Sequence, residues 1–274
     1  KQGNTTKGSD GKSIDGTSLK EIKQLIEELK KETYQPMPAR RTYIPKKNGK
    51  MRPLGIPAFR DKLVQEVMKM ILEAIYENSF SYMSHGFRPD KSCHTALKYL
   101  QDNFIGAKWF IEGDIKGFFD NVNHGKLLKQ IWTLGIRDKR LICIISKMLK
   151  AEIDGEGVPE KGTPQGGLLS PLLSLIVLNE LDWWVSSQWE TFQPKNRSKN
   201  GWLQYAKKYT KLKSGFIVRY ADDFKIMCST YGEAQRFYHS TVDFLNKRLK
   251  LEISPEKSKV VNLKKNSSDF LGFK

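Results

Sequence analysis

The sequence is poor in cysteine and has no long apolar run, and both shortages narrow what the protein can be. Its 3 cysteines lie far apart and include no C-x-x-C pair, so neither a disulfide framework nor a zinc site is expected. No apolar stretch approaches the ~20 residues that span a bilayer, and the N-terminal residues do not read as a secretory signal. We therefore expect a protein of a reducing compartment, the cytoplasm, with no membrane partner.

Acidic residues are scarce relative to basic ones. The chain of 274 residues has 47 Lys and Arg against 30 Asp and Glu, a net charge of +17. Such an imbalance favours a polyanionic partner, either nucleic acid or an anionic membrane surface. Since no segment is suited to a membrane, nucleic acid is the favoured partner.

Two adjacent carboxylates, Asp222 and Asp223, interrupt an apolar stretch, RYADDFKIMC. Apolar residues alternate with others before and after the pair, which predicts two strands joined by a tight turn. Such a turn can simply be solvated, because Asp side chains bond nearby backbone amides. It can also bind a hard divalent cation, which cancels the repulsion between the carboxylates. The second interpretation requires another carboxylate and a phosphate-bearing substrate.

The remaining pattern predicts a mixed α+β protein. Apolar spacing indicates helices at 19–29, from Asp61 to Ile75, at 124–134, at 138–150, from Ser170 to 185, and after a capping box at Thr230. Asp61 is expected to cap the second of these helices, whose apolar residues are Leu63, Val64, Val67, Met70, Ile71 and Ile75. Alternation predicts a hairpin at 40–57 that turns at Asn48-Gly49, a buried strand within 107–122, a strand pair near 250–263 and a strand start at 269–273. The polar stretch 186–214 is expected to be an exposed insertion, and Glu180 and Asp182 are expected on a helix surface. This order is compatible with a small antiparallel sheet backed by helices, of the split βαβ type.

Asp114 ends the strand WFIEGD and supplies the missing carboxylate if that strand lies beside the Asp-Asp hairpin. Asp114, Asp222 and Asp223 would then meet at one edge of the sheet. Three converging acids can hold two metal ions, one lowering the pKa of an attacking hydroxyl and one neutralising a leaving pyrophosphate. The basic hairpin offers Lys46 and Arg52 for a triphosphate. These parts predict a template-directed polymerase or another two-metal phosphotransferase acting on nucleic acid.

Several segments, in order, carry a resemblance to a known family. YADD resembles motif C of reverse transcriptases, DIKGFFDNV their motif A, and GTPQGGLLSPLLSLIVLNELD their motif B. YIPKKNGKMRPLGIP and SHGFRPDKSCHTAL are similar to the fingers motifs, and DFLGF to the start of the primer grip. In combination, over residues 13–273, they resemble the group II intron maturase reverse transcriptases rather than the retroviral branch.

This resemblance implies a right-hand polymerase fold of fingers and palm, the palm being the small antiparallel sheet. Residues 1–105 are implied to form an N-terminal extension and fingers, and residues 106–274 the palm, with a return to the fingers around 123–160. The family's thumb, DNA-binding and endonuclease regions are expected to be absent. A bacterial protein is implied, with an organellar origin left open.

The resemblance also implies roles for single residues. Asp114, Asp222 and Asp223 are implied ligands of two Mg²⁺ ions, for which Mn²⁺ can substitute. The implied nucleotide-binding residues are Lys46, Arg52, Phe119, Gln165 and Lys257. Phe119 is implied to exclude a ribose 2′-hydroxyl, with Phe118 beside it in the core, and Lys259 competes with Lys257 for the place near the leaving phosphate. Lys20, Lys23 and Lys30, on the first helix, are expected to bind RNA phosphates.

The implied function is copying of an RNA template from a DNA primer with dNTPs, combined with binding of intron RNA as a maturase for splicing and mobility. One alternative is an RNA-binding splicing cofactor in which catalysis is secondary. Another is a retron or diversity-generating reverse transcriptase, while Phe119 disfavours an RNA-dependent RNA polymerase. Self-association as a homodimer is left open.

Overall fold

The chain divides into two compact units, each made of two separate stretches. The computed structural model describes residues 5–45, 49, 51–103, 106–191 and 214–274. The first unit comprises Lys1–Ser79 and Gly117–Ile176, and the second comprises Phe80–Lys116 and Val177–Lys274. The boundary after Ser79 differs from the one expected after residue 105, and the assignment of fingers and palm to residue ranges stays a prediction.

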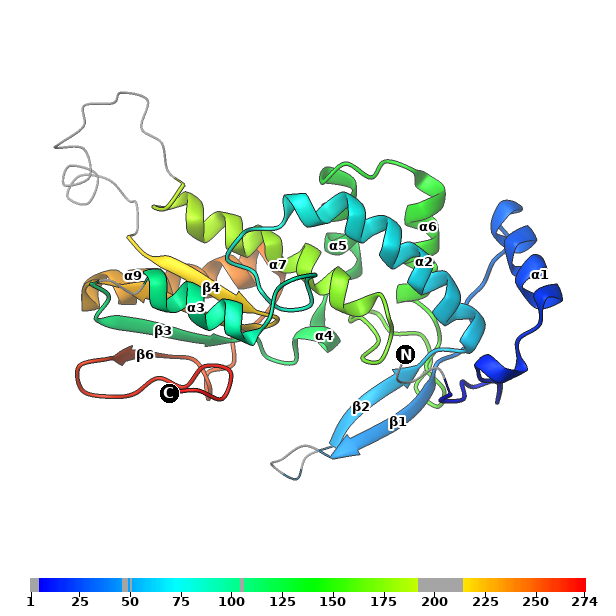
Figure 1. Cartoon of the computed structure of the whole chain (residues 1–274), viewed down its shortest axis with the longest axis horizontal. Coiled ribbons are helices and arrows are strands. Elements are labelled where there is room, and N and C mark those ends of the chain that lie inside the picture. Colours follow the sequence, from blue (N-terminus) through cyan, green and yellow to red (C-terminus); the bar gives the residue numbers. More distant parts are fainter. Residues whose placement is uncertain (1–4, 46–48, 50, 104–105, 192–213) are drawn as a thin grey trace. The chain divides into compact units, whose positions relative to one another are not determined.

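The first unit consists of helices and one hairpin (Figure 1). Its elements are α1 (Leu19–Lys30), β1 (Arg40–Pro45), β2 (Met51–Ile56), α2 (Phe59–Tyr76), α4 (Phe118–Asn121), α5 (His124–Thr133), α6 (Lys139–Leu149), the first part of α7 (Ser170–Ser187), and the short 3₁₀ turns Ile14–Gly16 and Glu77–Ser79. The antiparallel pairing of β1 with β2 confirms the hairpin that the Asn-Gly turn predicted. Residues 46–48 and 50 of its turn lie outside the described residues. Helices α5 and α6 are also confirmed, and their N-caps Asn123 and Asp138 accept backbone N–H groups of the first turn.

Helix α2 corrects two expectations. It begins at Phe59, so Asp61 is not its cap; instead the buried Asp61 carboxylate accepts hydrogen bonds from the Tyr34 hydroxyl (2.7 Å) and the Met37 N–H (2.9 Å). The expected apolar face is also wrong. Most of it is exposed, namely Val67, Met70, Ile71 and Ile75, whereas the buried apolar positions are Phe59, Val64, Met68, Leu72 and Tyr76. A spacing of four residues therefore defines the face that packs into the unit.

The second unit is built on a four-stranded sheet with the order β4-β5-β3-β6. Its strands are β3 (Trp109–Asp114), β4 (Phe216–Tyr220), β5 (Asp223–Cys228) and β6 (Lys259–Asn262), and its helices are α3 (Cys93–Asn103), the second part of α7, and α9 (Tyr231–Phe244), which continues as a π-helical turn at Leu245–Leu249. Every described strand pair is antiparallel. The expected small antiparallel sheet backed by helices is confirmed (Figure 1). So is the capping box, in which the Thr230 hydroxyl accepts the Glu233 N–H.

The end of the chain has less strand than expected. Of the strand pair near 250–263, only β6 forms in the described residues, and Ile253 makes an isolated bridge to Ile115. Phe270 and Phe273 bridge each other and start no longer strand. Residues 192–213 of the expected insertion lie outside the described residues. Among the described helices, none combines the length and apolar character needed to cross a bilayer.

The two faces of the sheet have different surroundings. Because side chains alternate along a strand, Asp114 and Asp223 share one face while Gly113 and Phe224 share the other. The Phe224 ring lies directly over Gly113, where an added Cβ would be 2.1 Å from the ring carbon Cζ. A glycine is therefore required at this position of β3, one residue before Asp114.

The close approach of Phe224 to Gly113 generates a stability prediction. Gly113→Ala is expected to destabilise the chain by ~1–3 kcal/mol, because a buried aromatic ring must move to admit the methyl group. Urea unfolding followed by circular dichroism measures the loss. Gly232→Ala is the matched control, since its nearest neighbour is the end of the Arg236 side chain at 3.9 Å. Equal midpoints for the two variants would contradict the packing argument.

Candidate active site

The strand register brings the predicted carboxylates of β3 and β5 together. Asp114, the last residue of β3, pairs directly with Asp223, the first residue of β5. Directly opposed residues on antiparallel strands have Cβ atoms about 4.5–5.5 Å apart and project to the same face. Tyr220 pairs with Asp223 across the hairpin, so Ala221 and Asp222 form a two-residue loop between β4 and β5. The structure therefore places the three predicted acids at one end of the sheet.

The crowding of these acids perturbs Asp223. The pKa of its carboxyl rises to about 6, first because it is buried and further because Asp114, Asp222 and Glu112 are negatively charged, although Lys225 acts in the opposite direction. A bound cation would favour the ionised form of the buried Asp223 carboxyl, because an opposite charge nearby lowers the pKa of an acid. Asp223 is therefore not explained as a freely solvated turn residue.

Lys257 approaches this cluster more closely than Lys259 does. The Lys257 ammonium donates a hydrogen bond to Asp114 Oδ2 at 3.1 Å, whereas Lys259 Nζ lies 3.6 Å from Glu112 Oε2. Residues before β6 also fasten the end of β3, because the Ser258 hydroxyl accepts the Asp114 N–H at 3.1 Å. This geometry favours Lys257 for the position near the acids, and its contact with a phosphate stays a prediction.

A buried ion pair beside the acids was not anticipated. Lys225 lies two residues after Asp223 and pairs in register with Glu112, two residues before Asp114. Lys225 Nζ is 3.3 Å from Glu112 Oε1, and the Ser268 hydroxyl donates to the same oxygen at 2.6 Å. Burial lowers the pKa of the Lys225 ammonium, and Glu112 opposes that effect. The signal available in the sequence was a lysine inside an apolar strand, on the face that carries Asp223.

The donor set suits a hard divalent cation, but its side chains are not arranged around one point. Carboxylate oxygens are the preferred ligands of such ions, and the pKa of Asp223 is raised first by burial and further by the neighbouring acids. Among the described residues, however, no group of three or more His, Cys, Asp or Glu side chains is placed to hold a metal ion. The Lys257 ammonium already neutralises one oxygen of Asp114. The three aspartates as metal ligands therefore stay a prediction whose chemistry fits.

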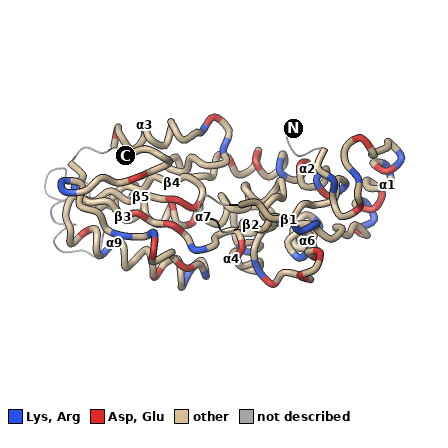
Figure 2. Tube along the Cα trace, turned by 90° about the horizontal axis from the view of Figure 1, so that it is seen from below, with Lys and Arg blue, Asp and Glu red and all other residues tan. Residues whose placement is uncertain are grey.

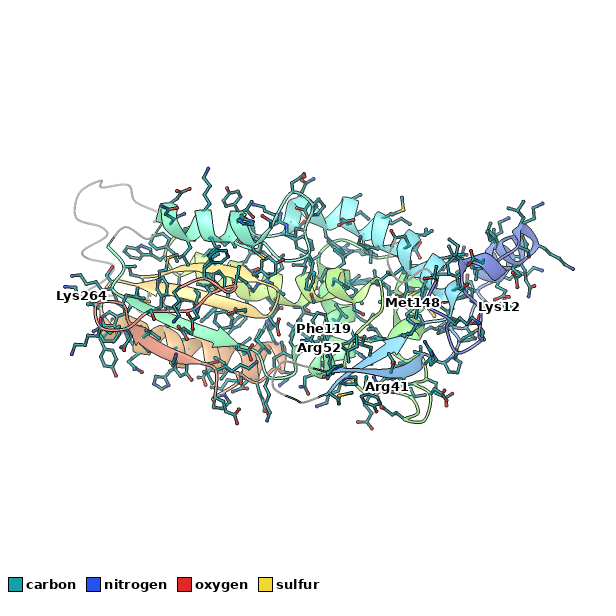
Figure 3. The ribbon with its side chains drawn as sticks, turned by 60° about the horizontal axis from the view of Figure 1, so that its bottom comes forward. Lys12, Arg41, Arg52, Phe119, Met148 and Lys264 are labelled. Atoms are coloured by element: carbon teal, nitrogen blue, oxygen red, sulfur yellow. The ribbon has the colours of Figure 1, made fainter. Side chains whose placement is uncertain are left out.

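The predicted nucleotide-binding residues Arg52, Phe119 and Gln165 belong to the first unit. Figure 3 labels Arg52 and Phe119. Arg52 is exposed on β2, and Lys46 lies outside the described residues. The Gln165 backbone carbonyl accepts the Gly55 N–H at 2.7 Å, and its side-chain amide donates to Asp120 Oδ1 at 3.1 Å. The loop that carries Gln165 is thus hydrogen-bonded to the strand that carries Arg52.

The local structure at Phe119 differs from the expectation. Phe118 and Phe119 lie on the short helix α4, not on an extended strand. Gly117, at φ 52°, begins that helix in the left-handed region that favours glycine. Phe118 is buried, as expected, and Phe119 is half-buried with its ring edge-on to that of Phe118. The division into one core ring and one more accessible ring arises from a helical turn rather than from strand alternation.

The predicted RNA-binding lysines are exposed along α1, where Figure 2 marks basic residues in blue. Lys30 forms an ion pair with Glu27 at 3.0 Å. Helix α1 is less well buried than its amphipathic pattern indicated, since Leu25 is its one buried residue.

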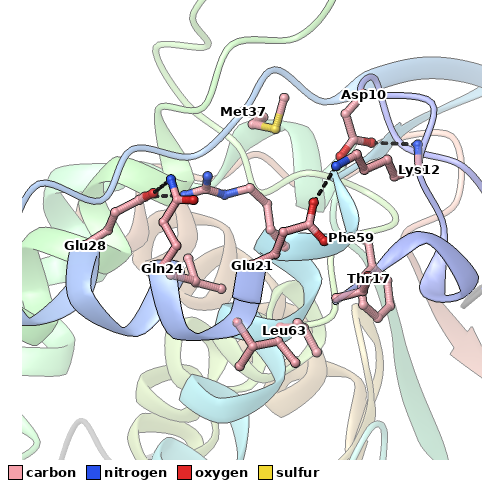
Figure 4. Close-up of a pocket in the computed structure, with 12 residues that line it drawn as sticks. Asp10, Lys12, Thr17, Glu21, Gln24, Glu28, Met37, Phe59 and Leu63 are labelled. Atoms are coloured by element: carbon pink, nitrogen blue, oxygen red, sulfur yellow. Dashed lines mark hydrogen bonds and ion pairs between the residues drawn. The ribbon is translucent and has the colours of Figure 1, made fainter. Parts of the chain in front are cut away.

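Beside α1 and α2 lies a cavity of about 310 Å³ (Figure 4). Its charged rim is paired internally, Lys12 with Glu21 and Arg60 with Glu28, and it contains none of the predicted site residues.

A small antiparallel sheet with carboxylates at one end fits the polymerase class that the sequence indicated, and comparisons with known proteins identify the family. The family described as "Reverse transcriptase (RNA-dependent DNA polymerase)" matches residues 44–274. The chain belongs to the reverse transcriptase family. The resemblance seen in the sequence is thereby confirmed at the level of the family.

Two curated relatives extend this result. The chain is 40% identical over 99% of its length to the group II intron-encoded protein LtrA of Lactococcus lactis subsp. cremoris, of which it covers 52%. It is 35% identical over 93% of its length to protein YkfC of Escherichia coli, of which it covers 74%. The chain thus spans about half the length of LtrA, and intron-encoded proteins are among its relatives.

Solved structures confirm the fold. Telomerase from Candida albicans, determined with a fragment of telomeric RNA, matches with a TM-score of 0.57 over 91% of this chain and 47% of that one, at 15% identity. Apo telomerase from Candida tropicalis matches with a TM-score of 0.57 over 93% of this chain and 51% of that one, at 14% identity. At such low identity the likeness concerns the fold alone.

The raised pKa of Asp223 generates a prediction about stability without divalent metal. An acid whose pKa rises on folding, here from 3.8 to about 6, loses stability as pH rises through that interval, because the unfolded state ionises first. Asp223→Asn is therefore expected to match the parent chain below about pH 4 and to exceed it by up to ~2 kcal/mol at pH 7 in a chelator. Thermal unfolding across that pH range measures the difference.

Asp243→Asn is the control for this comparison. Asp243 is an exposed carboxylate paired with Lys247 on α9 and its continuation, so its loss is expected to change stability little and never to raise it above pH 6. An Asp223→Asn chain that is less stable than its parent at pH 7 would show that the crowding argument is wrong.

Proposed function

We propose that the chain provides the polymerase core of an RNA-directed DNA polymerase encoded by a group II intron. One observation carries the proposal: the register sets Asp114 opposite Asp223, with Asp222 in the adjoining loop. Membership of the reverse transcriptase family and the similarity to LtrA support it. The substrates would be an RNA template, a DNA primer and dNTPs, and the site of action the bacterial cytoplasm.

In this proposal Asp114, Asp222 and Asp223 bind Mg²⁺, for which Mn²⁺ can substitute. A pair of such ions, when bound, activates the primer hydroxyl and neutralises the leaving pyrophosphate. Lys257, hydrogen-bonded to Asp114, brings a further positive charge to the end of the sheet. In that position an ammonium stabilises negative charge that develops on a leaving phosphate. The buried Lys225 limits the mutual repulsion of the acids.

Residues of the β1–β2 hairpin, together with Gln165 and Phe119, are proposed to recognise the incoming nucleotide. Arg52, and Lys46 from the same hairpin, suit a triphosphate, because guanidinium matches phosphate oxygens in bidentate fashion. Gln165 would lie near the base pair. Phe119 would occupy the space that a ribose 2′-hydroxyl needs and offers it no hydrogen bond, so a ribonucleotide would lose solvation without compensation.

Primer extension on an RNA template tests the proposal. With dNTPs and Mg²⁺ the chain is expected to lengthen a DNA primer, and Asp222→Asn is expected to reduce extension to background because a charged ligand is lost. Phe119→Ala is expected to raise rNTP incorporation by about tenfold to a hundredfold. This factor corresponds to the free-energy cost of burying one polar group, the ribose 2′-hydroxyl, without a hydrogen bond.

The controls separate chemistry from folding. Asp243→Asn changes an exposed carboxylate of the same unit and should extend normally, and every variant is first checked by thermal unfolding. Full extension by a folded Asp222→Asn chain would refute the catalytic assignment. An unchanged dNTP/rNTP ratio of kcat/KM in Phe119→Ala would move the sugar selection to another residue.

We also infer a second role, binding of intron RNA in support of splicing. The net charge of +17 and the exposed lysines of α1 favour it. Such contacts bind phosphates and do not read sequence. A relative of similar kind, the nuclear intron maturase 2 of Arabidopsis thaliana mitochondria, is 30% identical over 53% of this chain. RNA binding needs none of the three aspartates, so the two roles are separable.

The RNA-binding role predicts a steep dependence on salt. The logarithm of the association constant is expected to fall linearly with the logarithm of salt concentration, by ~0.7 for each phosphate neutralised on single strands. Replacing Lys20, Lys23 and Lys30 by Glu should weaken binding and flatten this slope, while Asp114→Asn should leave both unchanged. Fluorescence anisotropy with a labelled intron RNA measures the constants.

A charge-matched control is available in the second unit. Replacing the exposed Lys247, Lys250 and Lys264 by Glu changes the net charge by the same amount. If that variant loses as much affinity as the α1 variant, the overall charge and not α1 accounts for binding.

A further inference from the structure

An arginine lies buried beneath the proposed catalytic loop. Arg219, on β4, is only 1% exposed, and its partner Asp182, on α7, is 0% exposed. Arg219 Nε donates to Asp182 Oδ1 at 2.8 Å and Nη2 donates to Oδ2 at 2.5 Å. Asp182 was expected on a helix surface; the structure instead directs it into the second unit as half of a bidentate ion pair.

The remaining donors of Arg219 reach the loop and a neighbouring segment. Nη1 donates to the backbone carbonyl of Ala221 at 2.7 Å, and Nη2 donates to the Ser84 hydroxyl at 2.7 Å. Ala221 is the first residue of the two-residue loop, immediately before Asp222 and Asp223. One guanidinium therefore joins helix α7, residue 84 and the loop.

The loop has a backbone conformation that needs such support. Ala221 has φ 56°, in the left-handed region that is unfavourable for a residue with a Cβ. Residues held in this region persist when their surroundings determine them. The hydrogen bond from Arg219 fixes the carbonyl of that residue and thereby the direction in which the chain enters Asp222.

The segment 83–86, defined here as the strap, holds the same loop from the edge of the sheet. The Arg219 N–H donates to the Met83 carbonyl at 3.0 Å, and the His85 N–H donates to the Arg219 carbonyl at 2.9 Å. Gly86 lies so near the loop that an added Cβ would be 2.4 Å from Ala221 N. Helix α7 also holds the residues just before the strap, because Asn179 Oδ1 accepts a hydrogen bond from the Ser81 N–H at 3.0 Å.

We propose that Arg219 and Asp182 are positioning residues, which together with the strap set the geometry of the Ala221–Asp222–Asp223 loop. This inference rests on the proposed polymerase function, because the role given to these two residues is to position the catalytic aspartates. Arg219 itself projects from β4 onto the face opposite Asp223, with Val218 and Tyr220 on the acidic face. It acts through the backbone of Ala221 and touches no reacting atom.

A purely structural role makes a different prediction. Replacing a buried ion pair by apolar residues is often neutral or stabilising, whereas removing one partner strands a buried charge. The double change Arg219→Met with Asp182→Leu should therefore preserve the fold while deleting the donor to Ala221. If the pair serves stability alone, this folded variant should retain the behaviour of the parent chain.

The test compares this double variant with the parent chain in three measurements. Amide hydrogen exchange in a peptide covering 219–224 is expected to accelerate, by about tenfold or more if the loop opens locally. Mn²⁺ binding, followed by electron paramagnetic resonance, is expected to weaken. In primer extension, kcat is expected to fall by about a hundredfold with little change in the KM for dNTP, as a displacement of ~1 Å at reacting groups has that effect.

Two further variants separate the loop from the ion pair. Arg219→Lys retains the charge but lacks the forked donors, so it should not restore slow exchange. Gly86→Ala leaves the pair intact and pushes on Ala221, so it should reproduce the loss of kcat. The matched control is Arg248→Met with Glu180→Leu, which removes an arginine–carboxylate pair between the π-helical turn Leu245–Leu249 and the same helix α7. This control should leave exchange and extension unchanged.

The outcomes distinguish this inference from the proposed function. A folded double variant with parental exchange, Mn²⁺ binding and kcat would overturn the positioning role. If the parent chain neither extends a primer nor binds Mn²⁺, the polymerase proposal fails. Hydrogen exchange then still decides whether Arg219 and Asp182 hold the loop.

Discussion

The antiparallel register of β3 with β5 is the constraint on which the proposed site depends. Because side chains alternate, a slip of one residue would turn Asp114 and Asp223 to opposite faces of the sheet. Two neighbouring pairs secure the register from both faces. Gly113 admits the Phe224 ring on one face, and Glu112 binds Lys225 on the other. Neither pair tolerates a shifted partner, since a ring without its glycine clashes and a buried lysine without its acid is left uncompensated.

Charge is balanced locally around this register rather than across the unit. The acids at the end of the sheet have a lysine on either side: Lys257 hydrogen-bonds Asp114, and the buried Lys225 lowers the cost of ionising Asp223. On the opposite face, Arg219 and Asp182 neutralise each other beneath the loop. In a low-dielectric surrounding such fixed charges reorganise little. Under the proposed function, these charges would already be in place before a cation or a polyanion binds.

The sequence predicted the elements that depend on local chemistry and missed those that depend on distant partners. Period-two alternation and a two-residue polar interruption predicted the β4–β5 hairpin, and Thr230 with Glu233 predicted the start of α9. Asp182 and Lys225 were not predicted as buried, because a charged residue in a pattern indicates exposure unless its partner is known. Those partners are distant in sequence. Asp182 and Arg219 are 37 positions apart, and Glu112 meets Lys225 because their strands, β3 and β5, pair in the sheet. The apolar face of α2 was misjudged for a related reason, since several stripes of that helix are apolar and tertiary packing selects one.

The interleaved composition of the two units has a consequence for biosynthesis. Neither unit is a continuous stretch of chain, since each is completed by residues that follow a segment of the other. During translation the first unit is complete only when Ile176 has been made, after α5, α6 and the loop of Gln165. The sheet of the second unit is closed only when β6 has been made, although β3 is synthesised more than a hundred residues earlier. While the more than a hundred residues between β3 and β5 are being made, β3 therefore has neither strand neighbour. During that interval the nascent chain must keep this apolar strand from pairing elsewhere.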